Sequence, residues 1–277
     1  MHTGKIRQSV IAGAWYPGQP DKLRRTIDDF LKNVAPRPTE GQLVGLIAPH
    51  AGYAYSGQTA AHAYGQMAGA NYDVVAIVSP VHRMLLGRFA VTSAAAYETP
   101  LGLVELDDEL VGALAEKVRL NRVDRDGEHS LEIQLPFLQV VLGDFHLLPV
   151  MIGESSFEAG KELGTALAEV LKDRNALLVA STDLHHIQNY DEVVRRDQVV
   201  VDAIASFDMA RIQEVLSPWD CSVCGRIPVV AMLTAARALG ADKISILHHT
   251  NSGDVTGLRV PGQYTVGYLA AAVCKDG

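Results

Sequence analysis

Histidines follow three separate apolar runs of the sequence, each within a few residues of the end of its run. They are His50, His82 and the pair His185 and His186. Imidazole is the commonest metal ligand in proteins and the usual acid–base group near neutral pH. One such histidine is more often structural. Three at equivalent positions on neighbouring strands indicate a metal centre, a proton-transfer site or both.

A Cys-x-x-Cys motif, Cys221 and Cys224, comes directly before a predicted helix that begins near Gly225. A helix N-terminus favours the thiolate form of a cysteine, so this motif could be a redox dithiol. It could also be half of a zinc site, although only Cys274 remains and a site of four cysteines is excluded. Alternatively, Cys224 alone joins the histidines as a soft ligand, or both cysteines are buried and inert.

A third polar group, Glu128 and His129, comes directly before residues 130–142, which we expect to form an amphipathic helix. Acidic residues in a first turn complement the helix dipole, so capping explains this group as a structural feature. A supporting role beside a cleft explains it equally well.

The elements that position these residues are strands and helices in alternation. Near-continuous apolar runs are typical of parallel strands that are covered on both faces. We expect strands at residues 43–48, 74–78, 146–152, 176–180, 243–249 and 263–273, with a turn at 251–254 between the last two. We expect helices at residues 57–67, 107–118, 130–142, from about 156, 191–205 and 227–239. This pattern predicts one α/β domain over residues 1–277, with a mixed, mostly parallel central sheet and helices on both faces. Ligands of such sheets bind beyond the carboxyl ends of the strands, where the histidines lie.

Composition excludes several classes of protein. The chain has 277 residues, of which 48% are hydrophobic and 20% charged, which excludes wholesale disorder. Its net charge of −8 argues against nucleic-acid binding. We find no signal peptide and no apolar run near the roughly 18 residues of a membrane span. Three cysteines do not make a secreted disulfide framework, so we expect a cytoplasmic protein.

Standard motifs of several enzyme classes are absent from the sequence. It contains no G-x-G-x-x-G after the first predicted strand, no P-loop, no H-E-x-x-H and no G-x-S-x-G. The sequence therefore lacks the usual signatures of dinucleotide binding, P-loop phosphate chemistry, zincin proteolysis and α/β-hydrolase catalysis.

Six short segments, read together, resemble the Memo family, whose prokaryotic members are called AmmeMemoRadiSam system protein B. In chain order they are AGAWYP at 12–17, APHAGYAYSG at 48–57, EHSLE with LPF at 128–137, STDLHH at 181–186, CGRIP at 224–228 and NSGD at 251–254. The resemblance implies a fold similar to the class III extradiol dioxygenases, which hold a non-haem iron in a cleft beside the sheet. It also implies a functional link to a radical-SAM protein.

Carried over by these motifs, His50, His82 and Cys224 are expected to occupy the metal-ligand positions. His186, rather than His185, stands where those dioxygenases have their acid–base histidine. Asp183, Glu128 and His129 complete the catalytic set that the resemblance implies.

The sequence departs from the dioxygenase pattern at one place and from the Memo family pattern at another. Extradiol dioxygenases use two histidines and a carboxylate, whereas the third position here is Cys224. The segment before His82 reads Ser-Pro-Val, where the family commonly has Gly-Pro-Ser. We expect a divalent metal, Fe(II) first, with copper or zinc as the other candidates because a thiolate shifts preference towards them.

Three functions follow as hypotheses. The first is a metal-dependent, dioxygenase-like oxidoreductase that acts on an unknown small molecule. The second is a non-enzymatic binding protein that uses the same cleft for a peptide, a metabolite or a protein partner. The third is a redox dithiol protein that works through Cys221 and Cys224. We expect neither a nucleic acid nor a membrane as partner, and homo-oligomers are common among soluble proteins.

Overall fold

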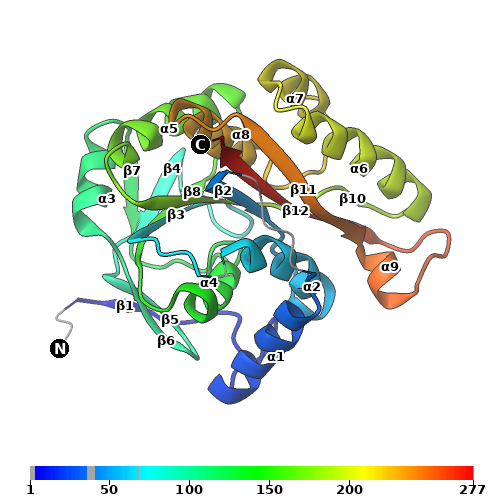
Figure 1. Cartoon of the computed structure of the whole chain (residues 1–277), viewed down its shortest axis with the longest axis horizontal. Coiled ribbons are helices and arrows are strands. Elements are labelled where there is room, and N and C mark those ends of the chain that lie inside the picture. Colours follow the sequence, from blue (N-terminus) through cyan, green and yellow to red (C-terminus); the bar gives the residue numbers. More distant parts are fainter. Residues whose placement is uncertain (1–3, 36–40, 68, 277) are drawn as a thin grey trace.

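A large mixed sheet runs through the middle of the molecule (Figure 1). The structure is a computed structural model that describes residues 4–35, 41–67 and 69–276. In spatial order the strands of the sheet are β10 (His186–Ile187), β12 (Thr265–Lys275), β2 (Gln42–Ala48), β9 (Ala176–Ser181), β3 (Val74–Pro80), β8 (His146–Ile152), β4 (Phe89–Thr92) and β7 (Leu120–Val123), and β11 (Lys243–Asn251) also pairs with β12.

The centre of this sheet is parallel, as the sequence predicts. Strand β9 pairs in parallel with β2 on one side and with β3 on the other, and β3 pairs in parallel with β8. Strands β12 and β4 are antiparallel to β2 and β8, which makes the sheet mixed. Leu46, Ile77 and Val179 of the central strands are completely buried, because both faces of the sheet are covered.

Helices cover both faces of the sheet (Figure 1). On one face lie α8 (Arg226–Ala238), which contacts β2, β3 and β9, and α5 (Phe157–Leu171), which packs on α8. On the other face lies α2 (Tyr53–Tyr64), and α1 (Pro20–Lys32) and α4 (Leu135–Leu142) pack against it. The predicted fold class, a single α/β domain with helices on both faces, is confirmed.

The remaining helices lie at the edges of these layers. Two of them, α6 (Tyr190–Ala205) and α7 (Met209–Leu216), pack on each other, and α6 contacts β10, β11 and β12. The others are α3 (Asp108–Ala115), α9 (Ser252–Thr256) and the 3-10 helices η1 (Gly65–Met67) and η2 (Glu132–Gln134).

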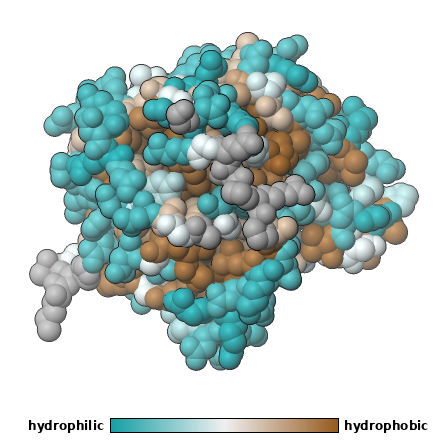
Figure 2. Space-filling model, viewed as in Figure 1, coloured by the Kyte–Doolittle hydropathy of each residue, from teal (hydrophilic) through white to brown (hydrophobic). Residues whose placement is uncertain are grey.

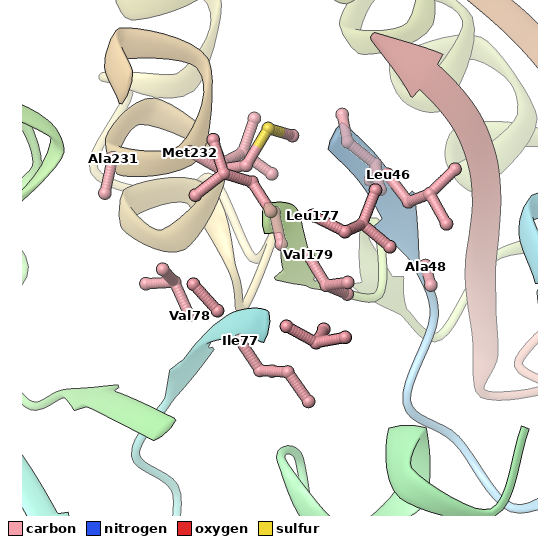
Figure 3. Packing of buried hydrophobic residues seen from close by; sticks show 14 of the residues in the cluster. Leu46, Ala48, Ile77, Val78, Leu177, Val179, Ala231 and Met232 are labelled. Atoms are coloured by element: carbon pink, nitrogen blue, oxygen red, sulfur yellow. The ribbon is translucent and has the colours of Figure 1, made fainter. Parts of the chain in front are cut away.

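Part of the core lies where α8 packs on the central strands. Figure 3 shows Met232 of α8 above Leu46, Leu177 and Val179, which come from β2 and β9. A Cβ at Gly45 would lie 2.9 Å from the Met232 Sδ, so the glycine lets this helix approach β2 closely. Each fully buried side chain of this size stabilises the fold by about 1.5–3 kcal/mol.

A small second sheet lies at the N-terminal side of the molecule (Figure 1). It consists of β1 (Ile6–Arg7), β5 (Ala96–Thr99) and β6 (Gly102–Glu105). Its strands are two to four residues long, too short to carry a readable alternation of apolar and polar residues.

The outside of the molecule is mostly hydrophilic. Figure 2 shows hydrophilic residues around the outline of one face, with hydrophobic residues visible between them. Within the described ranges, no helix combines the length and apolar character that crossing a bilayer requires.

Several predicted elements differ from the observed ones. The helix expected at 57–67 begins earlier, at Tyr53, and its expected last turn is the 3-10 helix η1. The helix expected at 130–142 is wrong in its first part, where η2 precedes α4. The turn expected at 251–254 is instead the start of α9, for which the Asn251 side chain accepts the Asp254 N–H as an N-cap.

Candidate metal centre

Two histidines and a cysteine from distant parts of the chain converge beyond the carboxyl ends of the central strands. One ligand atom each from His50, His82 and Cys224 lies within 4.8 Å of the other two. The Nε2 of His50 is 3.1 Å from the Sγ of Cys224. Two imidazole nitrogens and one sulfur form a donor set suited to zinc, copper or iron.

The order of the strands explains this convergence. His50 and His82 each follow a strand by two residues, and those strands, β2 and β3, lie on either side of β9. Cys224 comes just before α8, whose N-terminus meets the end of β9. A Cβ at Gly225 would lie 2.4 Å from the backbone oxygen of Ser181, so only glycine allows the Cys224 segment to lie this close.

Ser181 fixes the tautomer of His50. The Ser181 hydroxyl donates to the Ser130 carbonyl at 2.6 Å and accepts from the Gln134 amide at 2.9 Å. Its single proton is therefore used, so the His50 Nδ1, 2.9 Å away, must donate to it. The lone pair of His50 is then on Nε2, which faces Cys224. Hydrogen bonds of this kind orient metal-bound histidines in known sites.

Burial and neighbouring groups keep two of these ligands uncharged. Burial, with the nearby rings of His82 and His129, lowers the pKa of His50 well below its usual range. Burial, with the nearby Asp183 carboxyl, raises the pKa of the Cys224 thiol. A metal would bind the neutral His50 directly and would displace the proton of Cys224.

Glu128 holds the loop that carries His82. Its carboxylate accepts the backbone N–H groups of His82 at 2.9 Å, Arg83 at 2.6 Å and Met84 at 2.9 Å. The expectation that Glu128 lies in the first turn of a helix is wrong, because an irregular segment precedes η2. Glu128 therefore acts on the centre through the position of His82.

Asp183 supports the other two ligands. Its Oδ1 accepts the His50 N–H at 2.8 Å and the Ala51 N–H at 3.3 Å, and its own N–H donates to the Cys224 Sγ at 3.3 Å. Burial raises the pKa of Asp183 to about 7, against the opposing effect of the two backbone hydrogen bonds. This buried carboxyl can therefore both hold and release a proton near neutral pH.

His129 packs among the rings of the centre. Its ring centroid is 4.8 Å from that of His82, 5.7 Å from that of His50 and 4.4 Å from the ring of Trp15. Burial, followed by the charges of His82 and Arg83, lowers the pKa of His129 to about 3. Its Nδ1 is buried without a hydrogen-bond partner among the described residues. A neutral ring with a free nitrogen can bond to a ligand in the cavity.

A cavity of about 610 Å³ opens beside these residues. His50, His82, His129, Asp183 and His186 line its polar side, and aromatic side chains, Trp15 and Tyr264 among them, line the rest. Such a concave site with few polar groups and much aromatic surface fits a small organic molecule.

His186 faces this cavity, whereas His185 does not. The His186 Nδ1 lies 3.2 Å from the Tyr264 hydroxyl, and its Nε2 is buried without a partner among the described residues. Burial, then the neighbouring His82, lowers the pKa of His186 to about 4. His185 lines a different cavity together with Cys221.

The two cysteines of the Cys-x-x-Cys motif lie in different surroundings. Cys224 contacts His50 and Asp183, whereas Cys221 lies beside the His185 side chain in a separate cavity. None of the three cysteines forms a disulfide within the part of the chain that the structure describes. The motif is therefore two separate thiols in this structure.

A second group with metal-ligand geometry shares His82 with the first. It consists of His82, Glu128 and His129. The Glu128 carboxylate already accepts three backbone N–H groups, so binding a metal there would compete with holding the His82 loop. The group formed by His50, His82 and Cys224 fits a metal better.

No motif in the sequence singles out Arg7, Glu132 or Tyr264. The Arg7 guanidinium and the Glu132 carboxylate form a buried ion pair, and Glu132 also accepts from the Tyr16 hydroxyl at 2.6 Å. This pair ties the N-terminal segment to the loop of Glu128 and His129. Ser181 could have been identified from the sequence as a site residue, because it is a polar residue at the end of an apolar run.

Comparisons with known proteins agree with this arrangement. A MEMO1 family protein of Pyrobaculum aerophilum is 34% identical over 96% of this chain and 98% of its own length, and one of Thermotoga neapolitana is 38% identical over 96% and 99%. An uncharacterized protein of Escherichia coli K12, whose crystal structure covers 82% of this chain with a TM-score of 0.50 at 13% identity, shares the fold. The family model described as "Memo-like protein" matches residues 7–272. The chain therefore belongs to the Memo family.

Proposed function

We propose that this protein is a metal-dependent oxidoreductase that acts on a small molecule bound in the cavity beside the metal centre. His50, His82 and Cys224 would hold one divalent metal ion, with Fe(II) as our first candidate and copper or zinc as the others. The observation that carries the proposal is the convergence of three ligand atoms within 4.8 Å. The fixed tautomer of His50 supports it, because the Nε2 lone pair already faces the centre.

A bound metal would supply Lewis acidity and, if it is iron or copper, one-electron chemistry. The residues of the chain supply the rest. Trp15, Tyr264 and the other aromatic side chains of the cavity bind and orient the substrate and exclude water. Three protein ligands would leave coordination positions for water or substrate, as in catalytic rather than structural metal sites.

Two groups can move protons to or from a substrate. The Nε2 of His186 lies at the cavity without a partner among the described residues, and its low pKa keeps the ring neutral near pH 7. Asp183, with a pKa of about 7, can accept or release a proton close to the metal ligands. This pairing of a neutral imidazole with a poised carboxyl suits proton transfer during an oxidation.

Metal analysis of the purified protein tests the proposal. Wild-type protein, produced without a metal-binding tag, is expected to contain close to one metal per chain, and His50→Ala to lose it. His146→Ala is the matched control, because His146 is an exposed histidine at the start of β8. Loss of metal in both variants, or its absence from the wild type, would contradict the metal centre.

Oxygen uptake with a panel of catechols in the presence of Fe(II) tests the reaction. Substrate-dependent uptake that His186→Gln slows, while metal content stays the same, supports an oxidoreductase. Binding of small aromatic compounds without uptake across the panel would instead favour the second function, a binding protein that uses the same cavity.

A further inference from the structure

A second cluster of reactive side chains lies outside the metal centre, around Cys221. The His185 Nδ1 is 2.8 Å from the Oδ1 of Asp197, and the His185 ring lies beside Cys221, with which it lines one cavity. Asp197 is completely buried in α6 and also accepts the His185 backbone N–H at 3.0 Å. A thiol beside an imidazole that is itself bonded to a carboxylate has the parts of an activated nucleophile.

The fold builds a dedicated place for this carboxylate. A Cβ at Gly267 of β12 would lie 1.7 Å from the Asp197 Oδ2, so the carboxylate occupies space that only glycine leaves free. The Asp197 Oδ1 accepts from both the backbone N–H and the ring of His185, so the position of Asp197 fixes that ring.

The surroundings of Cys221 favour its thiolate. Burial opposes ionisation, but the neighbouring His185, the Val223 backbone N–H and the charge of Arg226 on α8 lower the pKa of Cys221 overall. Burial likewise opposes protonation of His185, yet Asp197 and Cys221 raise the pKa of its ring to about 9. Both shifts favour a thiolate–imidazolium pair.

This cluster opens into a cavity of about 290 Å³, separate from the cavity of the metal centre. His185 and Cys221 line it, and Cys221 is partly exposed. Val199 and Val215 form apolar walls, and two arginines, Arg195 and Arg196, with one carboxylate, Asp220, supply the charge among the lining residues that the structure describes. The cavity has the size of a small molecule, and its two guanidinium groups can donate hydrogen bonds to an anion, although Glu192, outside the lining, pairs with both arginines.

We propose that Cys221, His185 and Asp197 form a thiol–disulfide exchange site for small anionic disulfides. The Cys221 thiolate attacks one sulfur of the disulfide, so that a new S–S bond to Cys221 forms and the disulfide bond breaks. The departing thiolate takes the proton of the His185 imidazolium and leaves as a thiol. Cys221 is oxidised to a mixed disulfide, and the leaving sulfur is reduced.

One observation favours sulfur exchange over acyl transfer. The Cys221 N–H donates to the Pro218 carbonyl at 3.0 Å, so it is not free to stabilise an oxyanion. Sulfur exchange develops no oxyanion. Cys224 lies in the metal centre and Cys274 is buried in β12, so the product is a mixed disulfide with the small molecule.

Reaction with dithiobis(nitrobenzoate), an anionic disulfide, tests the proposal. Near pH 6, where an ordinary thiol with a pKa of about 8.5 is less than ~1% ionised, we expect Cys221 to react first, with peptide mass mapping locating the adduct. His185→Gln is expected to slow this reaction roughly tenfold or more and to move its pH profile to that of an ordinary thiol. His146→Gln is the control and is expected to react at the wild-type rate.

A second variant and a second probe keep the test decisive. Arg195→Gln is expected to reduce the preference for dithiobis(nitrobenzoate) over neutral dithiodipyridine, with Cys221 still the residue modified. Removal of metal with a chelator is expected to leave the Cys221 rate unchanged, which separates this site from the metal centre. First reaction at Cys224, or equal Cys221 rates in wild type and folded His185→Gln, would overturn the proposal.

Discussion

The Nε2 of His50 lies 3.1 Å from the Sγ of Cys224, although the two residues are 174 positions apart in the sequence. A nitrogen lone pair and a sulfur at this distance, in a partly buried place, are a preformed pair of metal ligands. Because Ser181 holds the His50 tautomer and Asp183 donates to the sulfur, both ligands are oriented before a metal binds.

Replacing Cys224 by serine is expected to remove the sulfur ligand and keep the size of the side chain. Cobalt(II) bound to the wild type should then show the intense near-ultraviolet absorption of a cobalt–thiolate bond, and Cys224→Ser should lack it. Cys221→Ser is the matched control, because Cys221 contacts His185 instead of the metal ligands. Loss of the band in Cys221→Ser and its survival in Cys224→Ser would reverse the assignment of the ligand.

Glu128→Gln tests the support of the His82 loop. The glutamine amide nitrogen would donate where a carboxylate oxygen now accepts backbone N–H groups, which leaves at least one buried donor unsatisfied. We expect a loss of about 1–3 kcal/mol in the free energy of unfolding. Metal affinity should fall about 10–100-fold, because the residue positions a ligand. Urea unfolding and metal titration measure the two effects.

Glu116→Gln, at an exposed position after α3, is the control for that variant. We expect it to change neither the free energy of unfolding nor the metal affinity. If Glu128→Gln bound metal as tightly as the wild type, the His82 loop would not depend on this carboxylate.

Arg7→Met is expected to destabilise the protein strongly. Its guanidinium pairs with Glu132 and lies 3.4 Å from Asp126, and all three side chains are buried. Removing the cation leaves buried carboxylates without their counter-charge, which costs about 3–5 kcal/mol of unfolding free energy. Chemical denaturation of the folded variant measures this loss.

Lys5→Met serves as its control. Lys5 and Asp124 form an ion pair at 4.0 Å, but their side chains are 58% and 83% exposed, so solvent screens the pair. We expect less than about 0.5 kcal/mol of change there. Equal effects of the two substitutions would show that Arg7 is no more important than a surface cation.

His248 contributes to the pH dependence of stability. Its ring stacks on that of His62 at 4.3 Å, and burial, then His62 and His249, lowers its pKa to about 4 from 6.5. Between about pH 6.5 and pH 4, His248 is protonated in the unfolded chain and neutral in the folded chain. Stability therefore falls as the pH drops from about 6.5 to about 4, by up to about 1.4 kcal/mol per pH unit from this group.

His248→Gln is expected to remove this contribution. Urea unfolding at several pH values should show a shallower loss of stability on acidification for the variant than for the wild type. Parallel curves for the two proteins would mean that His248 takes up its proton equally in the folded and unfolded states.

The central strands could be predicted because each is recognisable from a short stretch of its own sequence. Strands β2, β3, β8 and β9 are apolar runs, and burial on both faces requires such runs. The loops that carry His50 and His82 were predictable for the same reason, since each comes directly after a run. Helix α8 was placed within one residue of its start by the pattern of residues 227–239.

Long-range contacts of the site were not predictable from spacing. Tyr264 is 78 positions from His186, and Arg7 is 125 positions from Glu132. Only the folded backbone brings these partners together. The segment of Glu128 was misread as the first turn of a helix because an acidic residue before an apolar run has the same appearance whether it caps a helix or holds a distant loop.

The position of β12 has a consequence for the order of events in folding. Among the described strands β12 comes last in sequence, yet it lies between β10 and β2 and pairs with both. Within the described residues, β10 joins the sheet through β12, by the pairing of His186 with Val266. Strand β10 therefore has no place in the sheet until β12 has paired with β2. The side of the cavity that carries His186 can form only after that step.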